Sequence, residues 1–166
     1  MSEGIPVGAI PLRIYFHCGW CVLVTQDFES RLIEDKETLY IHDPDERREV
    51  YLSSMVLTPH DGKPFRKEDV LTLFPPDDMD GLRYVHDEEG FAGGALWFFG
   101  DDDLSGAAWV LMGMVVSEEA QKIARCTIVC TDQRDHGWAL ETWRSIRRET
   151  PELAAMKGKS VIVREV

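Results

Sequence analysis

The sequence predicts an α+β protein in which helices pack on an antiparallel-rich β-sheet. Three observations lead to this fold class. Most segments have the patterning of strands, only two have the spacing of an amphipathic helix, and most strands follow one another through short turns. The predicted order is β-β-β-β-α-β-β-β-α-β, which places the helices on a sheet of largely antiparallel strands.

Four strands are predicted before the first helix. The first strand alternates apolar and more polar residues with period two. Gly19 and Trp20 have the composition of a two-residue hairpin turn that leads into the second strand. An Asp-Pro-Asp sequence supplies turn chemistry after the third strand. These strands are expected at residues 12–16, 20–25, 38–42 and 49–57.

The first helix is predicted at about residues 66–74, where apolar residues recur on one stripe and two prolines follow. The second is predicted at 136–149, with Asp135 as its N-cap and Trp143 on its buried stripe. The remaining elements are a short strand at 82–86 within the acidic segment 77–90, a hairpin over 94–116, a strand at 121–131, a helical turn reaching Lys157 and a strand at 160–164.

Size and charge restrict the classes of function. The 166 residues are expected to form a single domain, 1–166. Eighteen basic and 30 acidic residues give a net charge of −12, which argues against binding to nucleic acid or to an anionic membrane. The N-terminus lacks the basic and apolar regions of a secretory signal, and no apolar run is long enough to span a bilayer. A cytoplasmic location is therefore expected.

The four cysteines are interpreted as reduced and structural. Cys18 and Cys21 form a CxxC motif, but a β-branched run follows it instead of the helix that activates a thioredoxin-type thiol. Cys126 and Cys130 would lie about 13 Å apart in a strand, too far for one metal ion to bind both. They share a face with apolar residues, which is typical of core cysteines.

No motif for a metal or a cofactor is complete. Asp101, Asp103 and Ser105 fit the first positions of a calcium loop, but Met112 stands where a bidentate glutamate is required. The densest histidine–carboxylate clusters surround His42 and His86. No metal, no cofactor and no catalytic residue is therefore predicted, and a small hydrolase or thiol enzyme using His42/His86 or Cys18/Cys21 stays open as the alternative.

Aromatic residues supply the candidate partner-binding site. Trp97, Phe98 and Phe99 are consecutive in a predicted strand, so they point to both faces of the sheet. If one face is left uncovered, an aromatic patch of the kind that marks partner sites remains. Trp109 and Trp143 are expected in the core. The predicted partner-binding residues are Trp97, Phe99, Trp138, Asp101, Asp102 and Asp103.

The stretch from Trp20 to Arg147 resembles the PsbP-like family, which includes the Mog regulators of a nuclear-transport GTPase. The matching features are ordered: a Trp opens a strand, a later strand ends in Asp43-Pro44, an "isv"-like strand spans 51–55, and the closing helix ends in Ser145-Ile146-Arg147. The resemblance implies an α/β/α sandwich around an antiparallel sheet. It also implies a binding or adaptor role, as in photosystem subunits, GTPase regulators and effector chaperones.

The function expected from these features is that of a non-catalytic protein-binding adaptor. Its acidic surface would steer it towards a basic protein partner. A secreted toxin or effector is one such partner, which would make the chain a cognate chaperone or immunity protein. An enzyme would instead need a concave pocket in which titratable groups converge.

Overall fold

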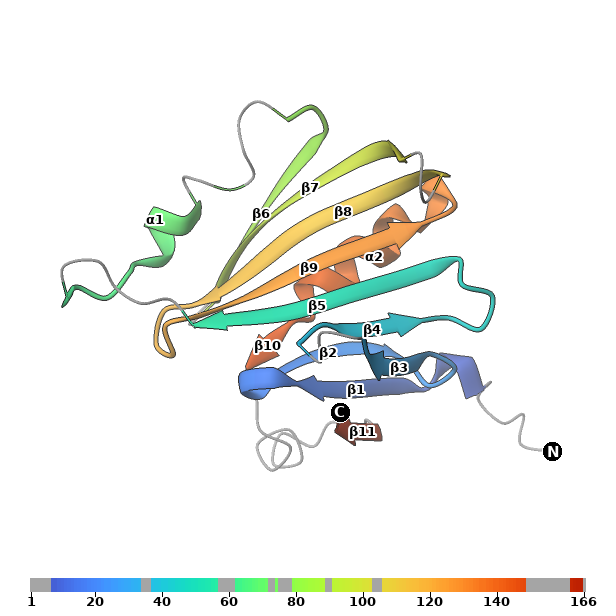
Figure 1. Cartoon of the computed structure of the whole chain (residues 1–166), viewed down its shortest axis with the longest axis horizontal. Coiled ribbons are helices and arrows are strands. Elements are labelled where there is room, and N and C mark those ends of the chain that lie inside the picture. Colours follow the sequence, from blue (N-terminus) through green and yellow to red (C-terminus); the bar gives the residue numbers. More distant parts are fainter. Residues whose placement is uncertain are drawn as a thin grey trace.

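The computed structural model describes residues 7–33, 37–56, 62–71, 74, 79–88, 91–102, 106–148 and 162–165. These residues form two β-sheets and two α-helices, so the α+β fold class and its antiparallel character are confirmed. The larger sheet is a curved seven-stranded layer, and helix α2 lies against it (Figure 1). The prediction of a single sheet was too simple, because the first two strands belong to a separate sheet.

The seven-stranded sheet is antiparallel throughout. Its strand order is β3-β4-β5-β9-β8-β7-β6. Its strands are β3 (Glu29–Leu32), β4 (Leu39–His42), β5 (Arg48–Val56), β6 (Leu82–Glu88), β7 (Phe91–Asp102), β8 (Gly106–Ser117) and β9 (Lys122–Cys130). Strand β3 was not predicted, because Glu-Ser-Arg-Leu carries no apolar alternation.

The four-stranded sheet has the order β10-β2-β1-β11, and only the β1–β11 pair is parallel. Its strands are β1 (Pro11–Phe16), β2 (Trp20–Thr25), β10 (Arg147–Arg148) and β11 (Ile162–Glu165). The predicted two-residue turn is corrected to a three-residue 3₁₀ turn, His17–Gly19. Gly19 closes this turn at a φ of 79°, a conformation that glycine adopts without steric cost, and Trp20 already belongs to β2.

Both helices are shorter than predicted. Helix α1 spans Lys67–Leu71 and contacts β7 and β8. Helix α2 spans His136–Arg144 rather than 136–149, because Arg147 and Arg148 pair with β2 as strand β10. Asp135 is at the predicted N-cap position, but its side chain makes no capping hydrogen bond. The helical turn predicted to reach Lys157 lies outside the described residues.

One face of the larger sheet, here called the inner face, is covered by α2 and by the smaller sheet. Trp143 of α2 is fully buried on this face. A Cβ at Gly113 would approach the Trp143 ring to 2.8 Å, and one at Gly93 would approach the same ring to 3.0 Å. Two strand glycines therefore give the indole its space, and its Nε1 donates to the Met114 carbonyl oxygen at 3.2 Å.

Candidate functional site

Five of the six predicted partner-binding residues lie in the described part of the chain, and they gather at one end of the seven-stranded sheet. Phe99 on β7 lies opposite Trp109 on β8, Trp109 lies opposite Cys130 on β9, and Cys130 lies opposite Arg48 on β5. These four residues form a continuous row across the inner face. The row ends beside the first turn of α2, so the strand register and the helix start together define the site.

Phe99 is the exposed member of this row, with 55% of its surface accessible. Its ring meets the Trp109 ring edge-to-face at 5.1 Å, and Trp109 stacks on Trp97 at 5.7 Å. His136, the first residue of α2, stacks on Trp97 at 4.6 Å. The start of α2 thus covers Trp97, two residues before Phe99 on the same face of β7, but does not reach Phe99. Trp97 is only 2% exposed and supports the surface from below.

Arg48 links the row to Trp138 on α2. Its guanidinium lies 4.8 Å from the centre of the Trp138 ring, within cation–π range. Its Nε and Nη2 both donate to one Asp135 carboxylate oxygen, at 3.0 and 2.6 Å. Trp138 in turn stacks on Phe28 at 5.7 Å. Phe28, Trp97, Phe99, Trp109 and Trp138, joined by Arg48, are called the aromatic band below.

Carboxylates border the aromatic band. A hollow of about 550 Å³ next to Arg48 is lined by Asp43, Asp45, Arg47, Arg48, Thr131, Asp132 and Asp135. Hydrogen bonds from Arg134 lower the pKa of Asp132 to about 2. One oxygen of Asp43 accepts from the backbone N–H groups of Arg47 and Arg48, which fixes the turn between β4 and β5. With Arg134, which pairs with Asp132, four carboxylates stand beside three guanidinium groups, so the hollow keeps a small excess of negative charge.

Two residues of the predicted acidic segment, Asp101 and Asp102, lie at the same end of the sheet. Asp101 and Asp102 are the last residues of β7 and pair with Ala107 and Gly106. Asp103 lies outside the described residues. Within the described part of the chain, no group of three or more histidine, cysteine or carboxylate side chains is arranged to hold a metal ion.

The structure separates the two histidines of the enzymatic alternative. His42 is on β4 and His86 is on β6, and four strands lie between them in the sheet. His42 stacks on Tyr40 at 5.0 Å, and its Nε2 lies 3.6 Å from a Glu29 carboxylate oxygen. A shared catalytic centre built on both histidines is therefore not assembled.

His86 belongs to a local cluster with Glu88 and Arg147. Arg147 Nη2 lies 2.9 Å from His86 Nε2 and 2.5 Å from a Glu88 oxygen. The pKa of His86 is lowered by burial and then by the neighbouring Arg147. We therefore assign His86 as neutral, with Nε2 accepting from Arg147. A proton on Nε2 would favour the 3.1 Å contact with Glu88, but Nε2 could then no longer accept the hydrogen bond from Arg147.

The cysteines take structural positions. Cys21 is a buried free thiol on β2 whose sulfur accepts from Arg13 Nη1 at 3.3 Å, and the side chain of Cys18 is not described. Strand β2, rather than a helix, follows the CxxC motif, as predicted. Cys126 and Cys130 are buried in the core, and burial raises the pKa of both, that of Cys130 to about 12.

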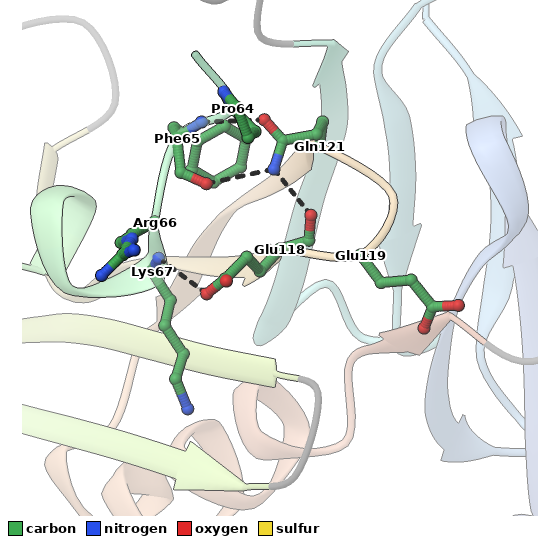
Figure 2. Close-up of a pocket in the computed structure, with 7 residues that line it drawn as sticks. All are labelled: Pro64, Phe65, Arg66, Lys67, Glu118, Glu119 and Gln121. Carbon is green, nitrogen blue, oxygen red and sulfur yellow. Dashed lines mark hydrogen bonds between the residues drawn. The ribbon is translucent and has the colours of Figure 1, made fainter.

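A second hollow of about 550 Å³ lies at the opposite end of the sheet, between the segment before α1 and the β8–β9 turn (Figure 2). Gln121 accepts from the Phe65 N–H at 2.9 Å and donates to the Phe65 carbonyl at 3.1 Å. The Lys67 N–H donates to a Glu118 oxygen at 3.3 Å. These bonds hold the segment on the sheet and account for the hollow as a structural feature.

Sequence reasoning missed several residues of the site. Two of them, Arg48 and Phe28, belong to the aromatic band. The other two support it: His136 stacks on Trp97, and Tyr84 Oη lies 2.9 Å from His136 Nε2. A signal existed for Arg48, because it shares the alternation of the buried Val50. No local pattern pointed to Phe28, which lies in the turn after β2.

No protein-family model matches the sequence, and no curated protein is similar to it at the sequence level. Solved structures do match. The solution structure of cyanobacterial PsbP (CyanoP) from Synechocystis sp. PCC 6803 superposes with a TM-score of 0.57 at 14% identity, covering 90% of this chain and 96% of that one. The fold is therefore PsbP-like.

A crystal structure from Bacteroides thetaiotaomicron VPI-5482 is also similar, with a TM-score of 0.53 at 7% identity. The match covers 81% of this chain but spans only 46% of the Bacteroides chain. At these identities both comparisons describe the fold. In the described part of the chain, neither helix is long and apolar enough to cross a membrane.

Proposed function

We propose that this chain is a non-catalytic protein-binding module of the PsbP-like family, and that the aromatic band is its contact surface for a basic partner. The observation that carries the proposal is the exposure of Phe99 above an ordered aromatic stack. Exposed apolar surface that is continuous with an aromatic cluster is typical of partner sites, and aromatic residues contribute much of the binding energy at protein interfaces.

The stack beneath Phe99 is preorganised for binding. Trp97 is held between Trp109 and His136, and the His136 ring is fixed by Tyr84. Little conformational entropy remains to be lost when a partner contacts such a surface, since the rings beneath it are already ordered. The surface therefore favours a partner that contributes apolar side chains.

The acidic border sets the charge of the partner. Asp43, Asp45, Asp132 and Asp135 line the neighbouring hollow, and the whole chain carries a net charge of −12. Such a field accelerates encounter with a basic protein and weakens as salt screens it. The expected partner thus presents lysine or arginine side chains next to an apolar contact. A secreted effector or toxin handled by this chain is one candidate class.

The test is a comparison of variants in capture from a lysate of the native host. Phe99→Ser removes the exposed ring, and Val56→Ser removes a 63% exposed side chain at the far end of β5. We expect one stoichiometric partner to be retained by the wild type and by Val56→Ser. Phe99→Ser should weaken retention by at least about tenfold, which corresponds to ~1.4 kcal/mol.

Retention should also fall when the salt concentration is raised, because the carboxylate border acts through screened electrostatics. Equal capture by Phe99→Ser and the wild type would contradict the proposal. So would the absence of any partner that distinguishes Phe99→Ser from Val56→Ser.

A further inference from the structure

Strand β6 forms the last strand of the seven-stranded sheet. It pairs with β7 on one side, and no described strand pairs with its other side. Its seven residues contain no proline, and Val85 and Leu82 are 68% and 55% exposed. An edge strand of this length can present its outward-facing backbone N–H and C=O groups to another strand. The identity of that strand can be argued from the side chains of β6.

The sequence of β6, Leu-Arg-Tyr-Val-His-Asp-Glu, is complementary to itself in the antiparallel direction. With Val85 opposite Val85 of a second copy, Arg83 of each copy lies opposite Asp87 of the other. Opposite charges directly across an antiparallel pair are stabilising, and an apolar pair then separates the two charge pairs. All three residues lie on the outer face of the sheet, since they alternate with the inner-face residue Tyr84.

Other symmetric registers are worse matched. A two-fold axis perpendicular to the sheet places the inner face of one copy beside the inner face of the other. Directly opposed residues must then share a face, so each alternative register changes the partner of a given residue by two positions. Centring the pair on Tyr84 places Arg83 against Val85, and centring it on His86 places Val85 against Asp87. Only the register centred on Val85 pairs every residue of β6 and forms both Arg83–Asp87 contacts.

The Asp87–Lys67 ion pair and the Arg83–Met79 hydrogen bond are compatible with the pairing. Asp87 is 59% exposed and accepts from Lys67 Nζ at 2.8 Å through one oxygen. A carboxylate has further acceptor sites, so Arg83 of a second copy can bind without displacing Lys67. Arg83 Nη2 donates to the Met79 carbonyl oxygen at 2.7 Å, and a guanidinium has five N–H donors.

We propose that two copies of this chain pair antiparallel through β6, with a two-fold axis at Val85 that joins the two seven-stranded sheets into one continuous sheet. The reciprocal Arg83–Asp87 pairs set the register. Two chains of net charge −12 repel each other, which opposes the dimer. Moderate salt reduces this repulsion, because most charges of one chain lie more than a Debye length from those of the other. The site proposed above for a basic partner is separate, centred on β7 and β8.

The test is sedimentation of the whole chain and its charge variants at moderate salt. The wild type should approach twice the 18.9 kDa mass of the monomer as its concentration rises. Arg83→Asp and Asp87→Arg each create two like-charge contacts and should weaken dimerisation at least tenfold. The double variant Arg83→Asp/Asp87→Arg reverses both contacts and should restore it. Lys67→Ala, which removes only the intrachain ion pair of Asp87, should dimerise like the wild type.

A cysteine cross-link tests the register. Val85→Cys places two thiols across the axis, and mild oxidation should yield a covalent dimer that the wild type does not form. Arg83→Cys is the matched control, because its two thiols would lie about 13 Å apart along the strands, beyond disulfide reach. A wild type that stays monomeric would overturn the proposal. A double variant that fails to recover dimerisation, or cross-linking by Arg83→Cys instead of Val85→Cys, would overturn it equally.

Discussion

At the scale of single residues, Gly113 leaves no room for a side chain between its strand and the Trp143 ring. A Cβ at Gly113 would lie 2.8 Å from a ring carbon that is fixed by burial and by a hydrogen bond. Gly113→Ala should therefore lower the free energy of unfolding by about 1–3 kcal/mol, the usual cost of overpacking a core. Chemical denaturation followed by Trp fluorescence measures this.

The control for Gly113→Ala is Gly137→Ala in α2, where an added Cβ meets nothing within 4 Å. Its stability should stay the same or rise by up to about 1 kcal/mol, since alanine favours a helix over glycine. Equal stability of the two variants would show that the ring has room at Gly113.

The buried histidines predict how stability depends on pH. Burial lowers the pKa of both His86 and His136 below their ordinary value of 6.5. Each histidine therefore binds a proton more readily in the unfolded chain, so its contribution to stability is complete above pH 6.5 and is lost as pH falls through the folded-state pKa. Urea denaturation at a series of pH values down to about 5.5 should show a falling free energy of unfolding.

The variants His86→Gln and His136→Gln assign this pH dependence. In each variant the free energy of unfolding should depend less steeply on pH, because a glutamine does not titrate in this range. If the free energy of unfolding depends on pH equally steeply in both variants and in the wild type, protonation of these two rings is not what destabilises the protein in mild acid.

At the scale of elements, the long strands could be predicted and the boundaries set by tertiary contacts could not. Strands β5, β8 and β9 carry clear apolar patterns and appear close to their predicted ranges. Helix α2 ends earlier than predicted because of a contact with strand β2, in which the Leu23 N–H donates to Ser145 Oγ at 3.0 Å. The chain is thereby turned into β10, which the helical periodicity alone did not reveal.

Ser145 gives a direct test of this helix end. Its hydroxyl donates to the Thr142 carbonyl at 2.6 Å while accepting from Leu23. Ser145→Ala leaves the Leu23 N–H without this acceptor and should cost about 1–3 kcal/mol. Hydrogen exchange of the Leu23 amide should accelerate in this variant.

Ser54→Ala is the matched control, because the buried Ser54 hydroxyl has no hydrogen-bond partner among the described residues. Its removal should be neutral or stabilising. A Ser145→Ala protein as stable as Ser54→Ala, with unchanged exchange at Leu23, would remove Ser145 from the account of how α2 ends.

At the scale of the whole molecule, the sequence located the candidate site in part. It indicated the end of β7 as a site, and Phe99 is exposed there. It also grouped Trp97 with the surface, whereas His136 covers that ring at the start of α2. Composition shows that aromatic residues are present, but the helix start decides which of them a partner can reach. Arg48 joins Trp138 to the same surface from a distant strand, which local patterns do not reveal.

The central claim, that the Phe99 end of the sheet contacts a partner, is tested most directly by photocross-linking in the native host. A photoreactive phenylalanine analogue replaces Phe99 in one strain and Val56, at the far end of β5, in another. We predict one discrete covalent adduct at position 99 and none at position 56. No adduct at position 99, or the same adduct at both positions, would contradict the claim.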